Sequence, residues 1–123
     1  MKKTNMNAEF WQALDQLAEQ AEIVIDRPKD SAHPKYPQLI YPLDYGYLSH
    51  TASADGEGID IWLGTDTAHR IEAVVCTVDL INRDSEIKIL IGCTQEEKQT
   101  VLAWHNRSAY MKAILIDREE RSE

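Results

Sequence analysis

The sequence predicts a mainly β fold of the α+β class, in which short strands form a small barrel or strongly curved sheet with one helix before them and one after. Apolar residues recur at helical spacing near the N-terminus, several short β-branched and aromatic runs follow, and a helix-capping pattern stands near the C-terminus. The chain has 123 residues, of which 43% are apolar and 28% charged, so we expect one domain over residues 1–123.

Two helices are predicted from local patterns. Over residues 7–21, apolar side chains recur every three or four positions, and polar side chains fall between them. Thr94 and Glu97 stand three positions apart, as in a capping box, where each side chain bonds the backbone N–H of the other residue. This pattern predicts that a second helix begins after Thr94 and ends near His105.

The strands are predicted from short runs rich in β-branched and aromatic residues and bounded by turn-forming residues. Pro28 ends the first run, and the turn-rich residues 29–37 break any regular element after it. A turn over residues 82–85 is expected to join the two longest runs as a hairpin. The predicted strands cover residues 22–26, 39–48, 59–63, 70–80, 85–91 and 110–116, the last of which is also compatible with a continued helix.

Charge and composition exclude several classes of function. The net charge is −8 and the pI is about 4.9, so the surface repels nucleic acid and anionic lipid headgroups. No apolar run approaches the roughly 18 residues that a membrane span needs, and the N-terminus does not resemble a signal segment, which predicts a cytoplasmic protein. Cys76 and Cys93 lie in or beside apolar runs, and we expect both to be buried, reduced thiols.

An acidic loop is the most informative segment of the sequence. Asp55, Glu57 and Asp60 lie within six residues, and two glycines between them relax the backbone. Divalent cations such as Mg²⁺ prefer several oxygen ligands at close range, and carboxylates repel one another unless a cation joins them. The segment therefore favours a metal site, with an ordinary acidic surface loop as the alternative.

Two further segments indicate phosphate binding. Tyr41, Tyr45 and Tyr47 stand a few residues upstream of the acidic loop, and a phenol donates a hydrogen bond to phosphate oxygen without adding charge. Aromatic packing in the core is the alternative for these rings. Glu86 and Lys88 alternate onto one face of a predicted strand, which puts an acid and a base side by side. A solvated hairpin face is the alternative for this pair.

Taken in order, these segments resemble the soluble, metal-dependent (family I) inorganic pyrophosphatases. Residues 55–61 are similar to the family's acidic signature D-x-D-P-x-D, with two changes. Residues 41–47 are similar to its Y-P-x-x-Y-G-Y run, at the same distance from the acidic signature. Residues 25–28 and 35–36 resemble the family's I-E-I-P strand and K-Y pair, and residues 84–88 resemble its later D-x-K segment.

The resemblance covers about residues 23–91 and implies a site as well as a fold. The implied fold is a small OB-like barrel of five strands, and the implied activity is Mg²⁺-dependent hydrolysis of inorganic pyrophosphate, with Mn²⁺ as a substitute. Glu57 would activate the nucleophilic water, with Lys35 and Tyr45 also in catalytic positions. The implied substrate-binding residues are Lys35, Tyr45, Lys88 and Tyr41, and the implied metal ligands are Asp26, Asp55, Asp60, Asp84 and Glu86.

The sequence departs from the family pattern mainly in its phosphate-binding half. Glu57, Glu86 and Asp26 keep the charge of the family's residue but change the side-chain length by about one methylene, and misplacement on that scale alters rates. Residues 37–40 replace a hairpin that carries a phosphate-binding arginine. The family's Tyr-Lys pair late in the second helix is missing; Arg107 lies near that place, with a plain surface arginine as the alternative.

Three functions remain open on these grounds. Hydrolysis of inorganic pyrophosphate, by a water activated between divalent ions, is the leading hypothesis. The second is hydrolysis of another phosphorylated small molecule, for which the missing hairpin leaves space. The third is non-catalytic binding of metal or phosphate, which the missing phosphate-binding residues favour. The expected partner is a small phosphate anion, with no nucleic acid and no membrane, and a homo-oligomer is left open.

Overall fold

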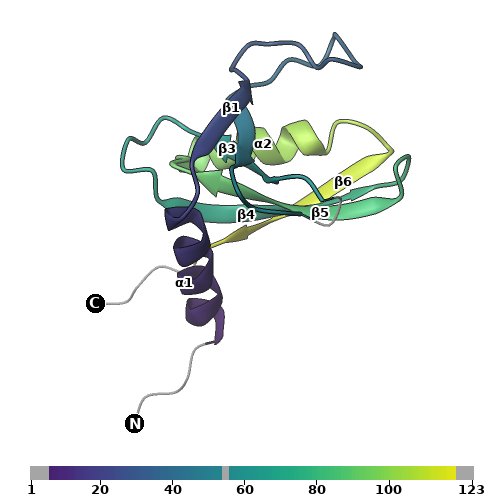
Figure 1. Cartoon of the computed structure of the whole chain (residues 1–123). Coiled ribbons are helices and arrows are strands. Elements are labelled where there is room, and N and C mark those ends of the chain that lie inside the picture. Colours follow the sequence, from purple (N-terminus) through teal and green to yellow (C-terminus); the bar gives the residue numbers. More distant parts are fainter. Residues whose placement is uncertain (1–5, 54–55, 119–123) are drawn as a thin grey trace.

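The computed structural model describes residues 6–53 and 56–118. Within these residues, six strands form one sheet in the order β1-β2-β3-β5-β4-β6, and two helices pack on it (Figure 1). Neighbouring strands are antiparallel, apart from β3 and β5, which run parallel. The elements are α1 (Met6–Glu19), β1 (Ile23–Arg27), β2 (Asp44–Leu48), β3 (Ile59–Leu63), β4 (Ile71–Asp79), β5 (Asp84–Ile91), α2 (Gln95–His105) and β6 (Met111–Asp117).

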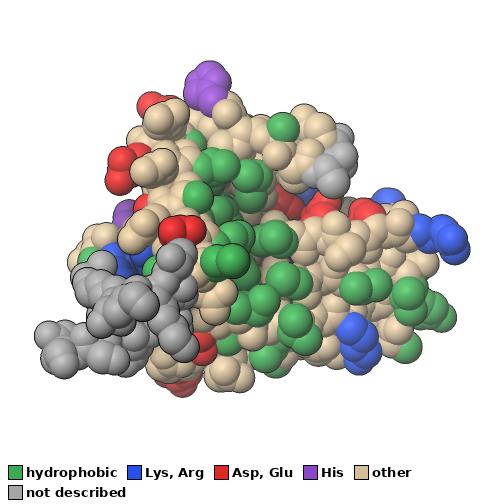
Figure 2. Space-filling view, turned by 90° about the horizontal axis from the view of Figure 1, so that it is seen from below, with side chains coloured by type: hydrophobic (Ala, Val, Ile, Leu, Met, Phe, Trp, Pro, Cys, Tyr) green, Lys and Arg blue, Asp and Glu red, His purple; other side chains and the backbone are tan. Residues whose placement is uncertain are grey.

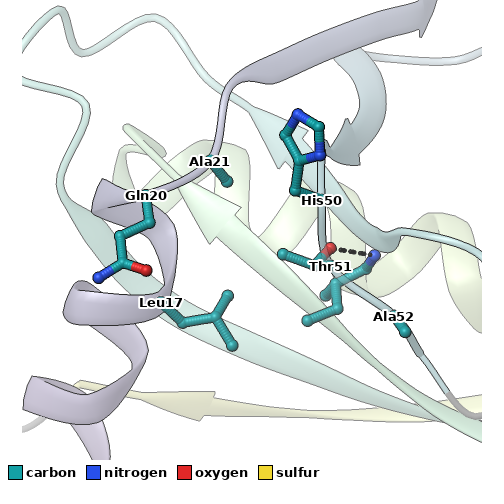
Figure 3. A pocket seen from close by; sticks show the side chains of 7 residues that line it. Leu17, Gln20, Ala21, His50, Thr51 and Ala52 are labelled. Atoms are coloured by element: carbon teal, nitrogen blue, oxygen red, sulfur yellow. Dashed lines mark hydrogen bonds between the residues drawn. The ribbon is translucent and has the colours of Figure 1, made fainter.

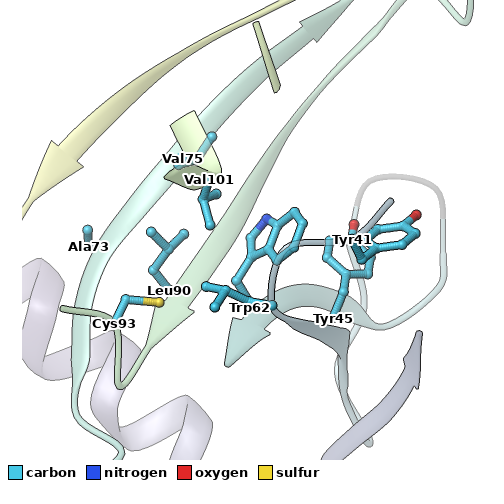
Figure 4. Close-up of a cluster of buried hydrophobic side chains, with 9 residues drawn as sticks. Tyr41, Tyr45, Trp62, Ala73, Val75, Leu90, Cys93 and Val101 are labelled. Atoms are coloured by element: carbon cyan, nitrogen blue, oxygen red, sulfur yellow. The ribbon is translucent and has the colours of Figure 1, made fainter. Parts of the chain in front are cut away.

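The two helices lie on opposite faces of the curved sheet (Figure 1). Trp11 of α1 packs with a buried cluster that includes Ile61 and Val74 of the sheet. Val101 of α2 packs on the other face, with a cluster that includes Trp62 and Leu90 (Figure 4). Successive strand residues point to opposite faces, so one continuous sheet supplies both clusters.

The structure confirms the mainly β, α+β class, and it corrects the predicted barrel of five strands. The sheet has six strands in the described residues and is not closed: β1 and β6 stand at the two ends of its order. The last strand predicted from the sequence is confirmed as β6, which pairs with β4 over seven residues instead of continuing α2. Its alternating burial shows that one row of its side chains, which includes Ala113 and Leu115, packs against the core cluster on the α2 face, while the other row faces outward.

The segment before β2 differs from the predicted strand over residues 39–48. Regular strand pairing begins at Asp44. Before it, Ile40 forms an isolated β-bridge with Ala32. Pro42 has no N–H to donate to a neighbouring strand, which agrees with this late start. The residues between β1 and β2 therefore form a loop that stands beside the end of β1 (Figure 1).

A close approach between β1 and β2 sets the direction of the end of β1. A Cβ atom on Gly46 would lie 1.8 Å from the carbonyl oxygen of Val24, so no larger residue fits here without moving the backbone. The strand register then shifts between Ile25 and Arg27, which leaves Asp26 out of the regular ladder. As a result Arg27 stands opposite Tyr45 of the neighbouring strand.

The predicted capping box of α2 is confirmed. The Thr94 hydroxyl accepts from the Glu97 N–H at 3.2 Å, and the Glu97 carboxylate accepts from the Thr94 N–H at 2.9 Å. Both cysteines are free thiols, as predicted, although Cys76 is half-buried and Cys93 is buried. Neither of the described helices has the length and apolar character needed to span a bilayer.

Candidate functional site

Three strands bring four polar side chains together on the α2 face of the sheet. Tyr45 comes from β2, Asp60 from β3, and Glu86 and Lys88 from β5. The Lys88 ammonium donates to the Tyr45 hydroxyl at 3.0 Å, to Asp60 Oδ2 at 2.9 Å and to Glu86 Oε1 at 3.2 Å. The Tyr45 hydroxyl in turn donates to Asp60 Oδ2 at 2.7 Å. We call these four residues the strand cluster.

The strand register explains why these side chains meet. Tyr45 pairs with Trp62, and Asp60 lies two residues before Trp62 on the same face of β3. Trp62 pairs in turn with Leu90 of β5, and Lys88 lies two residues before Leu90. The rings of Tyr45 and Trp62 are 4.7 Å apart between centroids and meet edge to face (Figure 4). The aromatic core therefore lies next to the strand cluster on the same face of the sheet.

Burial and hydrogen bonding act together on the pKa values of Tyr45 and Lys88. Lys88 is 6% exposed and Tyr45 is 9% exposed. Burial raises the pKa of Tyr45, so its side chain is a neutral phenol near neutral pH. Burial by itself lowers the pKa of Lys88, but its interactions with Tyr45 and Asp60 outweigh this effect, and the pKa is raised. A charged ammonium is thus held below the surface, and its three N–H groups have three acceptors.

Arg27 and Tyr41 form a second group beside the strand cluster. Arg27 Nη1 donates to the Tyr41 hydroxyl, and the guanidinium carbon lies 5.6 Å from the Tyr41 ring centroid and 5.9 Å from that of Tyr45. A guanidinium has five N–H donors, and this bond is the single one that Arg27 makes from its side chain among the described residues. The remaining donors are available to an anion that enters beside the two tyrosines.

The loop between β1 and β2 adds a histidine and a lysine beside this group. The His33 ring stacks on Tyr41 with 6.0 Å between ring centroids, and the Lys35 N–H donates to His33 Nδ1 at 3.0 Å. Burial lowers the pKa of His33, and the charges of Arg27 and Lys35 lower it further. Lys35 is exposed, so its ammonium can reach toward an incoming ligand.

The predicted metal ligands are only partly brought together. Asp60 and Glu86 converge on Lys88, whereas Asp26 and Asp84 are exposed, and Asp55 lies outside the described residues. Within residues 6–53 and 56–118, no group of three or more metal-binding side chains is close enough to hold an ion. The oxygen donors have the right chemistry for Mg²⁺, but the described residues do not bring three of them together, and the two carboxylates that converge are both ion-paired to Lys88.

The remaining predicted residues are found as follows. Glu57 is exposed in the loop that leads into β3. Tyr41 is 1% exposed and packs against Trp62 and Trp104, so it belongs to the core as well as to the site. Arg107 is exposed in the turn after α2. The core interpretation of Tyr41 is thus confirmed, and its role in phosphate binding stays a prediction.

The sequence indicates that Arg27 could supply a cation to the phosphate half of the site but does not fix its direction, and it gives His33 no role. Arg27 directly follows Asp26 in the strand run, and nothing in the local pattern indicates which way its side chain points. Arg27 lies near the rings of Tyr41 and Tyr45 and bonds the Tyr41 hydroxyl because the register shifts at the end of β1. His33 could have been noted from its position two residues before Lys35, but its stacking on Tyr41 depends on the fold of the loop.

A separate cavity of about 250 Å³ lies away from these residues. It is formed between α1 and the segment that follows β2, with Leu17, Gln20 and His50 in its wall (Figure 3). None of the predicted catalytic, substrate-binding or metal-binding residues that the structure describes lines this cavity. The candidate site is therefore the open face beside Arg27 and the strand cluster.

Comparison with known proteins gives a likeness of fold. No protein-family model matches the chain, and no curated protein matches its sequence. Its structure is similar to the crystal structure of an inorganic phosphatase from Anaplasma phagocytophilum, with a TM-score of 0.55 over 78% of this chain and 83% of that chain. The two sequences are 14% identical, so the likeness concerns the fold alone. The chain has an α+β scaffold similar to that of this phosphatase.

Proposed function

We propose that this protein hydrolyses a phosphoanhydride with the help of Mg²⁺ or Mn²⁺, and that inorganic pyrophosphate is the first substrate to test. The observation that carries the proposal is the convergence of the strand cluster beside Arg27. Cations of the kind that bind phosphate oxygens stand on one face with carboxylates of the kind that bind metal ions, a combination that phosphoryl chemistry requires. The similarity of the scaffold to that of an inorganic phosphatase supports the same class of reaction.

Arg27 is proposed as the first contact for the anion. Its guanidinium is planar, and it can bind two oxygens of one phosphate group at once. Lys35 would add charge from the loop, and Tyr41 would hold Arg27 in position through their hydrogen bond. This set provides the positive charge that an anion needs in order to approach a protein with a net charge of −8.

Lys88 and Tyr45 are proposed to bind the anion after a rearrangement of the strand cluster. The three donors of Lys88 are occupied, so a phosphate oxygen can bind it after Asp60 or Glu86 has moved away. We propose that these two carboxylates, with Asp26, Asp55 and Asp84, are the metal ligands. A bound divalent ion would neutralise the substrate and lower the pKa of a bound water.

We propose that Glu57 takes part in the chemical step by accepting a proton from the attacking water. A carboxylate accepts a proton from an attacking water when it lies within hydrogen-bond reach, and Glu57 belongs to the loop that enters β3 just before Asp60. Tyr45 stays protonated near neutral pH, because burial raises its pKa, and can therefore donate to a phosphate oxygen.

The decisive experiment measures phosphate release from pyrophosphate with Mg²⁺, Mn²⁺ or no added metal. We expect release by the wild type with a divalent ion, and a rate at least about 100-fold lower in Asp60→Asn, which keeps the side-chain shape and removes the charge. Asp66→Asn is the matched control, since Asp66 lies in the loop after β3 and bonds the Ala68 N–H. Folding of each variant is checked by circular dichroism.

If the folded wild type releases no phosphate from pyrophosphate when a divalent metal is present, pyrophosphate is refuted as the substrate. A panel of nucleoside polyphosphates and sugar phosphates then tests other phosphorylated small molecules. A second candidate function, non-catalytic phosphate binding, is favoured by the lack of a group of three metal-binding side chains within the described residues. Calorimetry showing pyrophosphate binding without turnover of any compound would support it.

A further inference from the structure

The sheet face that carries α1 is covered over part of its area. Trp11, Leu14 and Ala18 of α1 pack on the cluster that includes Val74 and Ile89. Farther along the same face, toward the β4–β5 hairpin, no described helix covers the strands (Figure 1). Figure 2 shows hydrophobic side chains gathered over much of this face.

Four aliphatic residues form the uncovered part of this face. Val78 is 49% exposed, Ile87 46%, Ile114 62% and Ile116 44%. The register places them together: Cys76 pairs with both Ile87 and Ile114. Strand alternation puts all four on the side of Val74 and Ile89, opposite to the strand cluster. We call these four residues the open patch.

The surroundings of the open patch are unusual for so acidic a protein. The chain has 21 acidic residues. None of them points outward on this face in the described parts of β4, β5 and β6 that extend beyond α1. The other residues on this face beside the patch are Cys76, Ser85 and Lys112. Leu80 and Ile81, each 61% exposed, continue the apolar surface into the hairpin turn. Electrostatic repulsion between two copies is therefore weakest when they approach through the open patch, because their acidic side chains lie on other surfaces.

The area fits a small interface between two chains. The open patch with Leu80 and Ile81 exposes on the order of 400 Å² of apolar side-chain surface, within the range of patches that mark interaction sites. Since interfaces are roughly 60% apolar, two such surfaces would bury a total of about 1,300 Å². Specific interfaces begin at about 1,200 Å², so the area suffices for a dimer that dissociates on dilution.

We propose that two copies of this chain form a symmetric dimer by packing their open patches face to face. The two sheets would stack about 10 Å apart, as in a β-sandwich, and the same residues would meet across a two-fold axis. Lys112 can extend its ammonium to the rim while its methylenes cover apolar surface. Because the patch lies on the face opposite to the strand cluster, dimerisation leaves the candidate site open, and the inference does not depend on the proposed function.

Sedimentation velocity of the full chain tests the dimer. Between about 1 and 300 µM, we expect the wild-type mass to rise from one chain to two, with a dissociation constant in the micromolar range. Ile114→Lys places a charge in the middle of the patch and is expected to weaken association at least tenfold. Met6→Lys is the matched control: it makes the same change in charge at an exposed residue of α1 and should associate like the wild type.

Several outcomes would overturn the dimer. The wild type could stay monomeric over the whole concentration range, or Ile114→Lys could dimerise like the wild type. Assemblies larger than two chains would indicate pairing along the free edge of β6. Binding of the monomer to anionic vesicles through the patch would assign it to a membrane instead. If Ile114→Lys does not fold, Val78→Thr, which keeps strand propensity, takes its place.

Discussion

At the scale of single residues, two cations of the candidate site differ in how many of their donors the fold already uses. The ammonium of Lys88 is buried and its three donors are occupied, whereas Arg27 makes one side-chain hydrogen bond among the described residues. An anion can therefore bind Arg27 without breaking any contact, but it must displace a carboxylate from Lys88. Arg27 is accordingly expected to govern binding, and the strand cluster to govern turnover.

Removing the charge of Arg27 should weaken substrate binding. We predict that Arg27→Gln raises the KM for pyrophosphate about 10- to 100-fold, because a hydrogen bond to a charged group contributes roughly 1.5–3 kcal/mol. Arg27→Lys should recover part of this loss, since a lysine keeps the charge but not the planar group. Steady-state kinetics of phosphate release gives KM and kcat separately.

Arg83→Gln is the control for this prediction. It makes the same change in net charge at an exposed residue of the β4–β5 hairpin. Equal kinetic effects in Arg27→Gln and Arg83→Gln would mean that Arg27 acts through the overall charge and does not contact the substrate.

At the scale of secondary-structure elements, α2 supports the tyrosine side of the site. Trp104 of α2 packs against Tyr41 and donates from Nε1 to the Ile40 carbonyl at 2.8 Å, which ties the loop before β2 to the helix. The N-terminus of the helix is fixed by Thr94 and Glu97, and Glu97 also accepts from the Thr65 hydroxyl. Capping of α2 thus contributes to the position of Tyr41 through the helix that carries Trp104.

Loss of the cap should destabilise the protein by a modest amount. We predict that Thr94→Ala lowers the free energy of unfolding by about 1 kcal/mol, because the side-chain acceptor for the Glu97 N–H is lost. Urea denaturation measures this change. Thr67→Ala, at an exposed loop position, is the control and should have little effect; equal losses in the two variants would contradict a specific role of the cap.

At the scale of the whole molecule, a buried histidine links stability to pH. His105 is 3% exposed, its Nε2 accepts from Trp62 Nε1 at 3.1 Å, and its Nδ1 has no hydrogen-bond partner among the described residues. Burial lowers the pKa of His105 to about 3, and the charge of Lys88 contributes in the same direction. Protonation of this ring would place a second buried positive charge, in addition to that of Lys88, beside the aromatic core.

Stability should therefore fall in acid. Because the pKa of His105 is lower in the folded than in the unfolded chain, the unfolded chain takes up the proton first. The contribution of the neutral ring is complete above about pH 6.5 and is lost progressively as the pH falls toward 3. We predict that it amounts to roughly 3 kcal/mol between pH 7 and pH 4.

Urea denaturation at pH 7 and pH 4 of the wild type and His105→Gln tests this. The variant, which cannot take up a proton, should lose less stability between the two pH values than the wild type. His50→Asn, which removes an exposed histidine, should lose as much as the wild type. Equal pH dependence of the wild type and His105→Gln would refute the role of His105.

Part of the site could be predicted from the sequence because it depends on local geometry. Glu86 and Lys88 alternate on one strand, so their side-by-side position follows from the period of two. The bond from Lys88 to Asp60 could not be predicted from local pattern, since it joins residues 28 positions apart and requires β3 and β5 to pair in parallel. The direction of Arg27 likewise depends on the register shift in β1.

The sequence by itself determined the kinds of element and most of their limits. Spacing, capping and turn chemistry act over a few residues, which is why β3, the hairpin and α2 were predicted closely. The tertiary structure decided which strands are neighbours, that the six strands form an open sheet, and that a lysine lies between two predicted metal ligands. These features arise from contacts between distant segments, whose free energy depends on register and burial and not on local pattern.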